Sequence, residues 1–403
     1  MTLVTQPIVL SGFRRLRVLG TLGALSAFGP LSMDLYLPVL PELGRALRTT
    51  DALAQLTMSM CMVGLALGQL LAGPVSDRIG RRRPLLLGVA TYAVASVLCA
   101  IAPDIWSLIG FRLVQGLAGA AGLVIARAMV RDLFDGDAAA KVFSLLILVG
   151  GLAPVVAPLA GGQLARFTDW RGMFVALAVI GVLLFLAALG LPETLAREAR
   201  HTGGLRETGR QFAVLVRDRG FIGYALVAAL AGCSLFLYIT LSPFVLQDGY
   251  GVTAQVFSAI FAVNSIGIVL AGNVNGVLVG RYGARRMLRI GLVVGLVGAL
   301  AALVGVLVGW GLFGLLPGLF VAVSSIGLVM PNTNALAMTP HGERAGTASA
   351  MLGVLQFLIG ATVPPLVSLA GANALSMTLS IFVTSVITLL VLITTLRARP
   401  KPA

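Results

Sequence analysis

The sequence predicts an all-α integral membrane protein in which twelve transmembrane helices form two pseudo-symmetric six-helix bundles. The first observation is composition: 58% of the 403 residues are hydrophobic and only 11% are charged, whereas soluble domains are typically about 25% charged. The second is a series of apolar windows of about 20 residues, the length at which a helix spans a bilayer. The third is an internal repeat, because "RIGRRR" at 78–83 recurs as "RYGARR" at 281–286.

The predicted helices follow the apolar windows, which are bounded by charged residues, prolines or glycines. They cover roughly residues 17–40, 52–75, 84–103, 106–130, 141–165, 172–191, 221–245, 254–279, 286–309, 311–331, 347–370 and 373–396. The expected parts are an N-terminal segment 1–16, a bundle 17–191, a polar central loop 192–219, a second bundle 220–396 and a tail 397–403. The arginines before the first apolar run resemble the start of a signal peptide. That run continues past Asp34 without a cleavage site, so a retained first helix is predicted.

Arginine and lysine are distributed unevenly between the predicted loops. They cluster before the first helix, between the second and third, in the central loop, and in the matching loops of the second half. The other side of the membrane carries only Arg45, Arg48, Arg166 and Arg171. By the positive-inside rule we expect both termini in the cytoplasm and a multi-pass protein of the cytoplasmic (inner) membrane. The same rule explains the net charge of +14, and no nucleic-acid partner is expected.

The two halves repeat with an offset of 203 residues, counted from residue 78 to residue 281. Two parallel six-helix repeats with a site between them near the bilayer midplane are typical of secondary transporters. We therefore predict a transporter that acts as a monomer.

Several other classes of protein are disfavoured by what the sequence lacks. Cys61, Cys99 and Cys233 lie in apolar segments without a CxxC pair, and His201 and His341 lie in polar loops, so no metal site is predicted. There is no HExxH sequence and no GxxxxGK[ST] loop, which argues against a membrane protease and against a nucleotide-driven pump. We expect no enzyme and no cofactor. A passive channel and a receptor also fit poorly with a two-half repeat that carries one central acid.

The loop "GPVSDRIGRRRPLL" at 73–86 joins the second and third predicted helices. Its arginines alone would suit an ordinary anchoring loop, but the full spacing resembles the G-x-x-x-D-R-x-G-R-R motif of the major facilitator superfamily. In that family the loop latches the two halves during the conformational cycle, so the resemblance implies a major facilitator fold and a latch. The residues assigned to this latch are Gly73, Asp77, Arg78, Gly80, Arg81, Arg82, Asp132 and Arg344. The second copy of the loop has Gly280 in the position of the aspartate, so any latch there must differ.

The fourth and fifth predicted helices carry further motifs of this superfamily. "FRLVQG" resembles its R-x-x-Q-G motif through Arg112, Gln115 and Gly116, and the first two are three residues apart and so share a helix face. "GGLAPVVAPLAGG" at 150–162 contains two prolines four residues apart in a glycine-rich span, which bends a helix and allows close neighbours. It resembles the motif found mainly in antiporters of the superfamily, and the matching residues are Gly151, Pro154, Pro158, Gly161 and Gly162. The alternative is an ordinary kinked helix, but the resemblance favours export over nutrient uptake.

Finer resemblances extend over essentially the whole chain. "MDLYLPVLP" in the first helix, "LFLYITLSPFVLQDGYG" in the seventh and "GTASAMLGVLQFLIGA" in the eleventh resemble the bicyclomycin/chloramphenicol resistance (Bcr/CflA) branch of drug:proton antiporters. The resemblance implies a proton-coupled multidrug exporter of amphipathic antibiotics such as chloramphenicol or bicyclomycin, driven by the proton gradient. The alternatives are an exporter of a native metabolite or amino acid on the same fold and, less favoured, a proton symporter.

Asp34 is the acidic residue that the sequence places inside a membrane span, since the others fall in loops or at helix ends. An intramembrane ionisable group is a functional site by default, so Asp34 is predicted to take up the coupling proton. Asp34 and Arg112 each lie about six residues inside the same end of their helices, roughly 9 Å deep, so pairing between them is possible. The alternative is that Asp34 merely neutralises Arg112 and holds two helices together.

The substrate pocket is predicted from aromatic, methionine and amide side chains that suit varied ligands. The candidates are Asp34, Tyr36, Met58, Met62, Arg112, Gln115, Tyr238, Phe261, Asn264, Asn332, Gln356 and Phe357. Residues of this kind at helical spacing are more often packing residues. Asn273 and Asn275 are predicted to hydrogen bond between helices.

Overall fold

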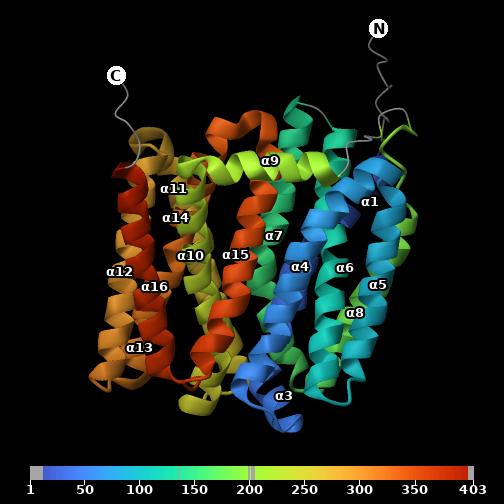
Figure 1. Cartoon of the computed structure of the whole chain (residues 1–403). Coiled ribbons are helices and arrows are strands. Elements are labelled where there is room, and N and C mark those ends of the chain that lie inside the picture. Colours follow the sequence, from blue (N-terminus) through green and yellow to red (C-terminus); the bar gives the residue numbers. More distant parts are fainter. Residues whose placement is uncertain (1–11, 135, 198–199, 201–204, 398–403) are drawn as a thin grey trace.

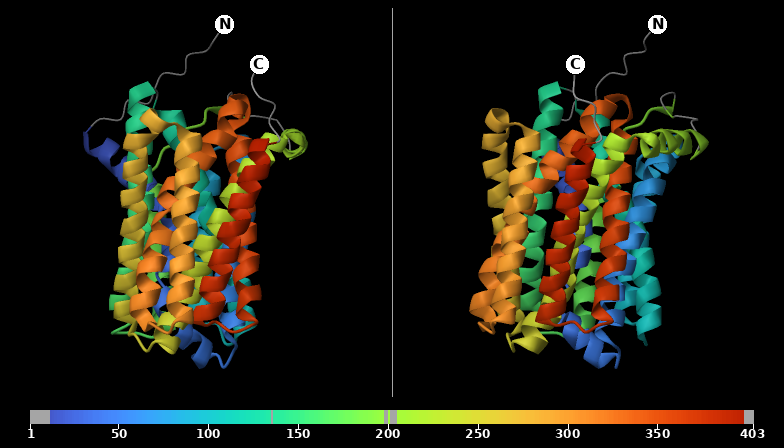
Figure 2. Two further views of the ribbon diagram at one scale, coloured as in Figure 1. Left: turned by 90° about the vertical axis from the view of Figure 1, so that its left-hand side faces the viewer. Right: turned by 60° about the vertical axis from the view of Figure 1, so that its left-hand side comes forward.

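The computed structural model describes residues 12–134, 136–197, 200 and 205–397, and the regular structure in these residues is entirely helical. The long helices run roughly parallel to one another in every view (Figure 1 and Figure 2). One face of the bundle holds the start of the first helix, the end of the last helix and helix α9; we call it the terminal face. The other, which holds α3, we call the opposite face (Figure 1).

The first half contains the elements up to α8. They are α1 (Gly12–Ser26), α2 (Phe28–Asp34), the 3-10 turn η1 (Leu37–Val39), α3 (Leu40–Ala46), α4 (Asp51–Ile79), α5 (Arg82–Ala100), α6 (Ile105–Leu133), α7 (Gly136–Leu164) and α8 (Trp170–Leu189).

The second half follows the central loop. It contains α9 (Leu205–Arg217), α10 (Arg219–Pro243), the π-helical turn η3 (Phe244–Gly249), α11 (Ala254–Tyr282), α12 (Ala284–Leu307), α13 (Gly311–Ser324), α14 (Ile326–Met338), the turn η4 (Thr339–Arg344), α15 (Ala345–Ser368) and α16 (Ala374–Arg397).

Eleven of the described helices are long and apolar enough to cross a membrane, and a twelfth span exists if α1 and the segment Phe28–Ala46, which contains α2, η1 and α3, count as one span bent by 42° between Ser26 and Phe28. This agrees with the predicted twelve, but the predicted helix 17–40 is not continuous. Pro38 and Pro41 lack the N–H that a continuing helix needs, and each restricts the residue before it. The chain therefore makes the 3-10 turn η1 there. The tenth predicted helix runs seven residues further than expected, from 331 to Met338, and breaks at Ser325.

The repeat seen in the sequence reappears in matched helices. α4 and α11 each contain 29 residues, and their ends, 51 and 254 or 79 and 282, differ by 203 positions. Thr50 and Thr253 cap them with side-chain oxygens that accept from Leu53 N and Val256 N, each over 3.3 Å. Both helices end at a glycine with positive φ, Gly80 at 101° and Gly283 at 78°, a backbone conformation that favours glycine.

Helix α9 is an addition to the prediction, because the polar central loop was expected to be a plain connection. It lies across the terminal face, at a large angle to the long helices (Figure 1), and packs on α10 and α15. Leu215 is fully buried on its inner side.

The two halves meet along α4 with α15 and along α7 with α11. Polar contacts cross this boundary near the opposite face. Arg45 and Asp248 form an ion pair of 2.6 Å, Gln247 Nε2 donates to the Pro38 carbonyl over 3.0 Å, and Ser368 Oγ donates to Gln55 Oε1 over 2.7 Å. These contacts hold the halves together on the opposite side of the bundle.

Candidate functional site

Asp34 is the last residue of α2, just before the 3-10 turn η1 in the first membrane span. Its side chain is 5% exposed, and its carboxylate makes no hydrogen bond or ion pair with any residue that the structure describes. Its electrostatic neighbour is the Tyr238 hydroxyl of α10, in the other half. The turn η1 that follows packs on both α10 and α11. Asp34 therefore lies in the first half at the boundary with the second.

Arg112 of α6 is completely buried in the first half. Its guanidinium donates to Gln115 Oε1 over 2.5 Å, to the Ser32 carbonyl over 2.9 Å and to the Thr57 carbonyl over 3.3 Å. The group also lies 4.5 Å from the centre of the Tyr36 ring, a distance at which a cation is attracted to the ring face. Arg112 thus connects α2, α4 and α6.

An Asp34–Arg112 pair is therefore not formed, which corrects the pairing considered from the sequence. Equal depth in two helices fixes height but not the direction in which a side chain points. Residues two apart on a helix face different ways, so Arg112 reaches the Ser32 carbonyl without pairing with the Asp34 carboxylate. The Arg112 guanidinium is satisfied by carbonyl oxygens and aromatic rings. The Asp34 carboxylate has no ion-pair partner among the described residues.

Several predicted pocket residues are brought together on either side of the boundary. In the second half, Asn264 Nδ2 donates to the Tyr238 hydroxyl over 2.8 Å, and Phe261 stacks on the Tyr238 ring with centres 5.5 Å apart. In the first half, the Tyr36 hydroxyl lies 3.2 Å from Thr57 Oγ1, and the Gln115 amide donates to Ser96 Oγ over 2.6 Å.

The remaining pocket candidates lie between α4, α10 and α15. Met58 and Met62 are fully buried. Phe357 packs on Phe236 with ring centres 6.1 Å apart, and the half-buried Gln356 lies against Gly232. These side chains pack against one another, so a ligand needs the two halves to separate here before it can enter.

Asn332, which was predicted to line the pocket, makes its hydrogen bonds within the second half. Its amide donates to Asn275 Oδ1 over 2.5 Å and to the Leu328 carbonyl over 2.7 Å. The bond joins α14 to α11 within the second half. It is the interhelical role predicted for Asn275, and it occupies the amide assigned to the pocket. Asn273 is exposed, which does not fit the interhelical role predicted for it.

The two-proline motif of α7 contacts both halves. Gly161 lies so close to the Leu35 carbonyl that a Cβ atom would overlap it, and a Cβ on Gly162 would overlap Ser258 of α11. Gln255 Nε2 of α11 donates to the Gly162 carbonyl over 3.0 Å. By contrast, a Cβ on Gly151 would meet nothing within 4 Å. The helix thus has its close contacts at one end of the motif.

The predicted latch loop forms a network within the first half, on the terminal face. Arg81 bonds to Asp77, to Asp132 over 2.9 Å and to Ser76 Oγ over 2.9 Å. Glu193, which the sequence analysis did not single out, accepts from the backbone N–H groups of Arg81 over 2.7 Å and Arg82 over 3.2 Å. The sequence feature that could have identified Glu193 is its position in "LPETL", directly after the sixth span.

The other predicted latch residues contribute no side chain to this network. Gly73 lies within α4, and Gly80 directly follows its last residue. Arg78, in the last turn of α4, is exposed. Arg82 donates to the Leu189 carbonyl over 2.9 Å. Arg344 ends the turn η4 of the second half. In that half, the Asp218 carboxylate lies 3.1 Å from His341 Nε2.

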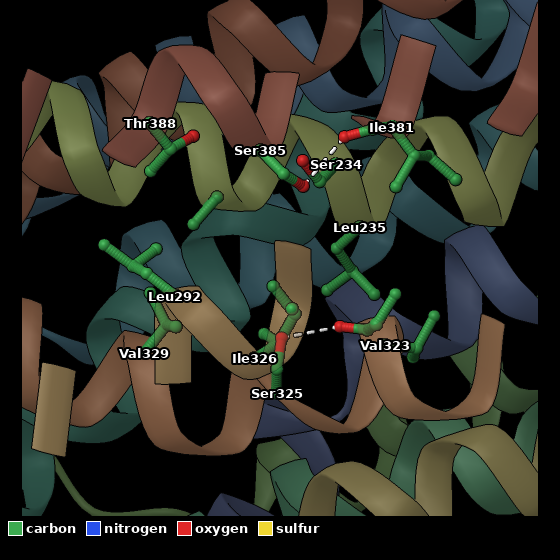
Figure 3. Close-up of a pocket in the computed structure, with 13 residues that line it drawn as sticks. Ser234, Leu235, Leu292, Val323, Ser325, Ile326, Val329, Ile381, Ser385 and Thr388 are labelled. Atoms are coloured by element: carbon green, nitrogen blue, oxygen red, sulfur yellow. Dashed lines mark hydrogen bonds between the residues drawn. The ribbon is translucent and has the colours of Figure 1, made fainter. Parts of the chain in front are cut away.

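A small cavity inside the second half is separate from this boundary. It measures about 30 Å³ and is lined by hydroxyl groups from Ser234, Ser325, Ser385 and Thr388 among aliphatic side chains (Figure 3). A cavity of this volume has room for one or a few water molecules, so it is too small for a drug.

Comparison with known proteins agrees with this architecture. An uncharacterised MFS-type transporter of Bacillus subtilis is 40% identical over 94% of both chains. A bicyclomycin resistance protein homologue of Haemophilus influenzae is 32% identical over 86% of this chain and 88% of its own. The crystal structure of the nucleoside transporter NupG matches with a TM-score of 0.77 at 14% identity, over 94% of this chain and 99% of the other, which shows the shared fold.

The family model of the Major Facilitator Superfamily matches residues 22–365. This stretch includes the span that carries Asp34, the latch loop and the two-proline helix. The chain therefore belongs to the Major Facilitator Superfamily, as a transporter rather than an enzyme, on the branch whose members are named for drug resistance.

Proposed function

We propose that this protein is a proton-coupled exporter of amphipathic antibiotics such as chloramphenicol or bicyclomycin, in which proton and drug compete at Asp34. The observation that carries the proposal is the isolation of this carboxylate. It is buried at the boundary of the halves, within electrostatic range of the Tyr238 hydroxyl, while the buried cation Arg112 is satisfied by other groups. An ionised carboxylate without a partner is costly at membrane depth, and binding a proton removes that cost.

The exchange follows from this position. When the site faces the acidic side, Asp34 loads a proton and its half packs against the second half. A drug that enters between Tyr36 and Tyr238 displaces the proton, and rocking of the halves then exposes the site to the other side. With a neutral drug each cycle moves one net charge, worth about 2.3 kcal/mol per 100 mV.

The proposal also assigns orientation. The arginine-rich terminal face is cytoplasmic by the positive-inside rule, so the contacts near the opposite face close the outer side. We therefore propose a monomer in the cytoplasmic membrane that is closed on its outer side in this state.

Transport into proteoliposomes under an imposed pH gradient tests this function. We expect the parent to move chloramphenicol or bicyclomycin against its concentration, and Asp34→Asn to lose gradient-driven transport while still binding drug. Asp104→Asn is the matched control, because Asp104 caps α6 at the surface with bonds to Trp106 N and Ser107 N. Undiminished gradient-driven transport by Asp34→Asn would place the proton site elsewhere. Failure of the parent on both drugs, followed by transport of a metabolite or amino acid, would favour the alternative exporter.

A further inference from the structure

A groove on the outside of the first half lies between α4 and α5, with α6 as its floor. α4 and α5 both pack closely on α6 and much less on each other; α6 is seen between them in Figure 1. The groove has a volume of about 290 Å³, and its lining runs from Arg83 at the terminal face to Thr91 near mid-depth. Eight helical residues correspond to a length of about 12 Å. It is distinct from the boundary between the halves.

Small residues create the groove. A Cβ on Gly68 would come within 2.6 Å of the Ala120 methyl group, and one on Gly88 within 2.5 Å of the Ala121 methyl group. Both helices therefore touch the floor helix through glycine, and no side chain fills the space above these contacts. Ala118 and Ala121 continue the floor.

The walls of the groove are apolar and face outward. Leu71 of α4 and Leu117 of α6 are partly exposed, and Leu87 of α5 is 71% exposed. In a chain that spans a membrane, surfaces of this kind at this depth face lipid acyl chains. The occupant therefore has to be apolar along most of its length.

Arg83 places a cation at the end of the groove. The three consecutive arginines of the latch loop have different surroundings: Arg81 is buried against Asp77 and Asp132, and Arg82 donates to the Leu189 carbonyl. Arg83 is exposed, lines the groove, and makes no hydrogen bond or ion pair among the described residues. Its guanidinium is available to an anion at the level where α5 begins.

We propose that this groove binds an anionic phospholipid, with the headgroup phosphate on Arg83 and one acyl chain along α6 between α4 and α5. Charge at one end and apolar walls along the rest match a phospholipid of the adjoining leaflet, and guanidinium groups suit phosphate oxygens. A soluble anion uses only the Arg83 end. Because Arg83 lies in the first turn of α5, an occupied groove also braces the start of this helix.

Native mass spectrometry of the purified, delipidated protein titrated with dioleoyl-phosphatidylglycerol tests the proposal. We expect Arg83→Gln to weaken binding of the first lipid about fivefold, the loss for one basic residue near a membrane surface. Arg131→Gln is the matched control, since Arg131 is also an exposed arginine at the terminal face, in the last turn of α6, but does not line the groove. This variant should bind the lipid as the parent does. Ala72→Phe fills the groove with Arg83 intact and should also weaken binding.

Each of three results would overturn the proposal in variants whose thermal stability equals that of the parent. Equal binding by Arg83→Gln and the parent would exclude the phosphate contact. Unchanged binding by Ala72→Phe would place the lipid outside the groove. Binding of inorganic phosphate with the same affinity as the lipid would show an anion site that does not use the acyl chain.

Discussion

The Ser265 hydroxyl of α11 donates to the carbonyl oxygen of Pro154 in α7, over 3.3 Å and across the boundary between the halves, and shares its proton with the Phe261 carbonyl of its own helix over 3.0 Å. This carbonyl is available because Pro158, four residues later, has no N–H to close the helical bond. The spacing of the two prolines therefore has a structural consequence beyond a bend. It provides an acceptor in one half for a donor in the other, at mid-depth in the bundle.

Replacing Ser265 by alanine should loosen this boundary. Because the proton is shared with the Phe261 carbonyl, the bond across the boundary is worth about 0.5 kcal/mol, so the population of the state closed at the opposite face should fall about twofold relative to the open state. Distances between spin labels placed on α7 and α11 near the opposite face measure this population. Ser380→Ala is the control, because Ser380 donates within its own helix to the Met377 carbonyl; an equal shift in both variants would contradict the account.

Glycines of the two-proline motif should differ in their tolerance of alanine. Gly161→Ala places a methyl group into the Leu35 carbonyl just before the turn η1 in the first span, whereas Gly151→Ala meets open space. We expect the first to lose most transport activity and the second to retain it. Rates per molecule of folded protein in proteoliposomes check this. Equal activity of the two variants would show that close packing at Gly161 is not required.

Asp34 and Arg112 should have independent effects on stability. Arg112→Gln removes charge-assisted hydrogen bonds to the Ser32 and Thr57 carbonyls, a loss of about 3 kcal/mol or more. Asp34→Asn removes no ion pair and relieves a buried charge, so its melting temperature should equal or exceed that of the parent. The two changes should add in the double variant. Strong coupling between them in thermal melts would instead indicate the direct pair that the structure does not contain.

Glu193 should stabilise the fold through the acceptor oxygen atoms of its side chain. Glu193→Ala leaves two backbone N–H groups without acceptors at the start of α5, which costs about 1–3 kcal/mol for each unsatisfied group that stays buried. Glu193→Gln keeps one acceptor oxygen. We expect the alanine variant to unfold at a clearly lower temperature than the glutamine variant. If both variants melted together, the N–H groups would have another acceptor.

Asp218 gives the stability a pH dependence. Partial burial opposes its ionisation, but the N–H groups of Phe221 and Gly220 and the neighbouring His341 ring hold the pKa of the Asp218 carboxyl below its usual range. Stability from a lowered carboxyl pKa is fully present above the unfolded-state value of about 3.9 and is lost as the pH falls through the folded-state value. The melting difference between the parent and Asp218→Asn should therefore shrink below about pH 4, and a constant difference would contradict this.

Much of the fold follows from the sequence because membrane helices are long, apolar and repeated. The positions of α4 and α11 are implied by the 203-residue offset between their loops. The turn η1 after Asp34 was less evident, since apolar character continues through Pro38 and Pro41. Amphipathic α9 lay inside a polar connection, where the search for apolar windows does not detect helices.

The site was predictable in its residues but not in its contacts. Helix depth placed Asp34 and Arg112 at one level, but the direction of each side chain depends on how helices rotate and break. Asn332 has the chemistry of a pocket residue, yet its partner Asn275 is 57 positions away, and only the packing of α11 on α14 brings them together. Glu193 likewise acts on a loop that precedes it by more than a hundred residues, from 81 to 193.

Competition between proton and drug at Asp34 is tested most directly by proton release on binding. The purified protein is mixed with bicyclomycin or chloramphenicol in weakly buffered solution, and the protons released are measured against the drug bound. The account predicts release by the parent and no release by Asp34→Asn, which still binds the drug. Proton release by Asp34→Asn equal to that of the parent would contradict the central role of this carboxylate.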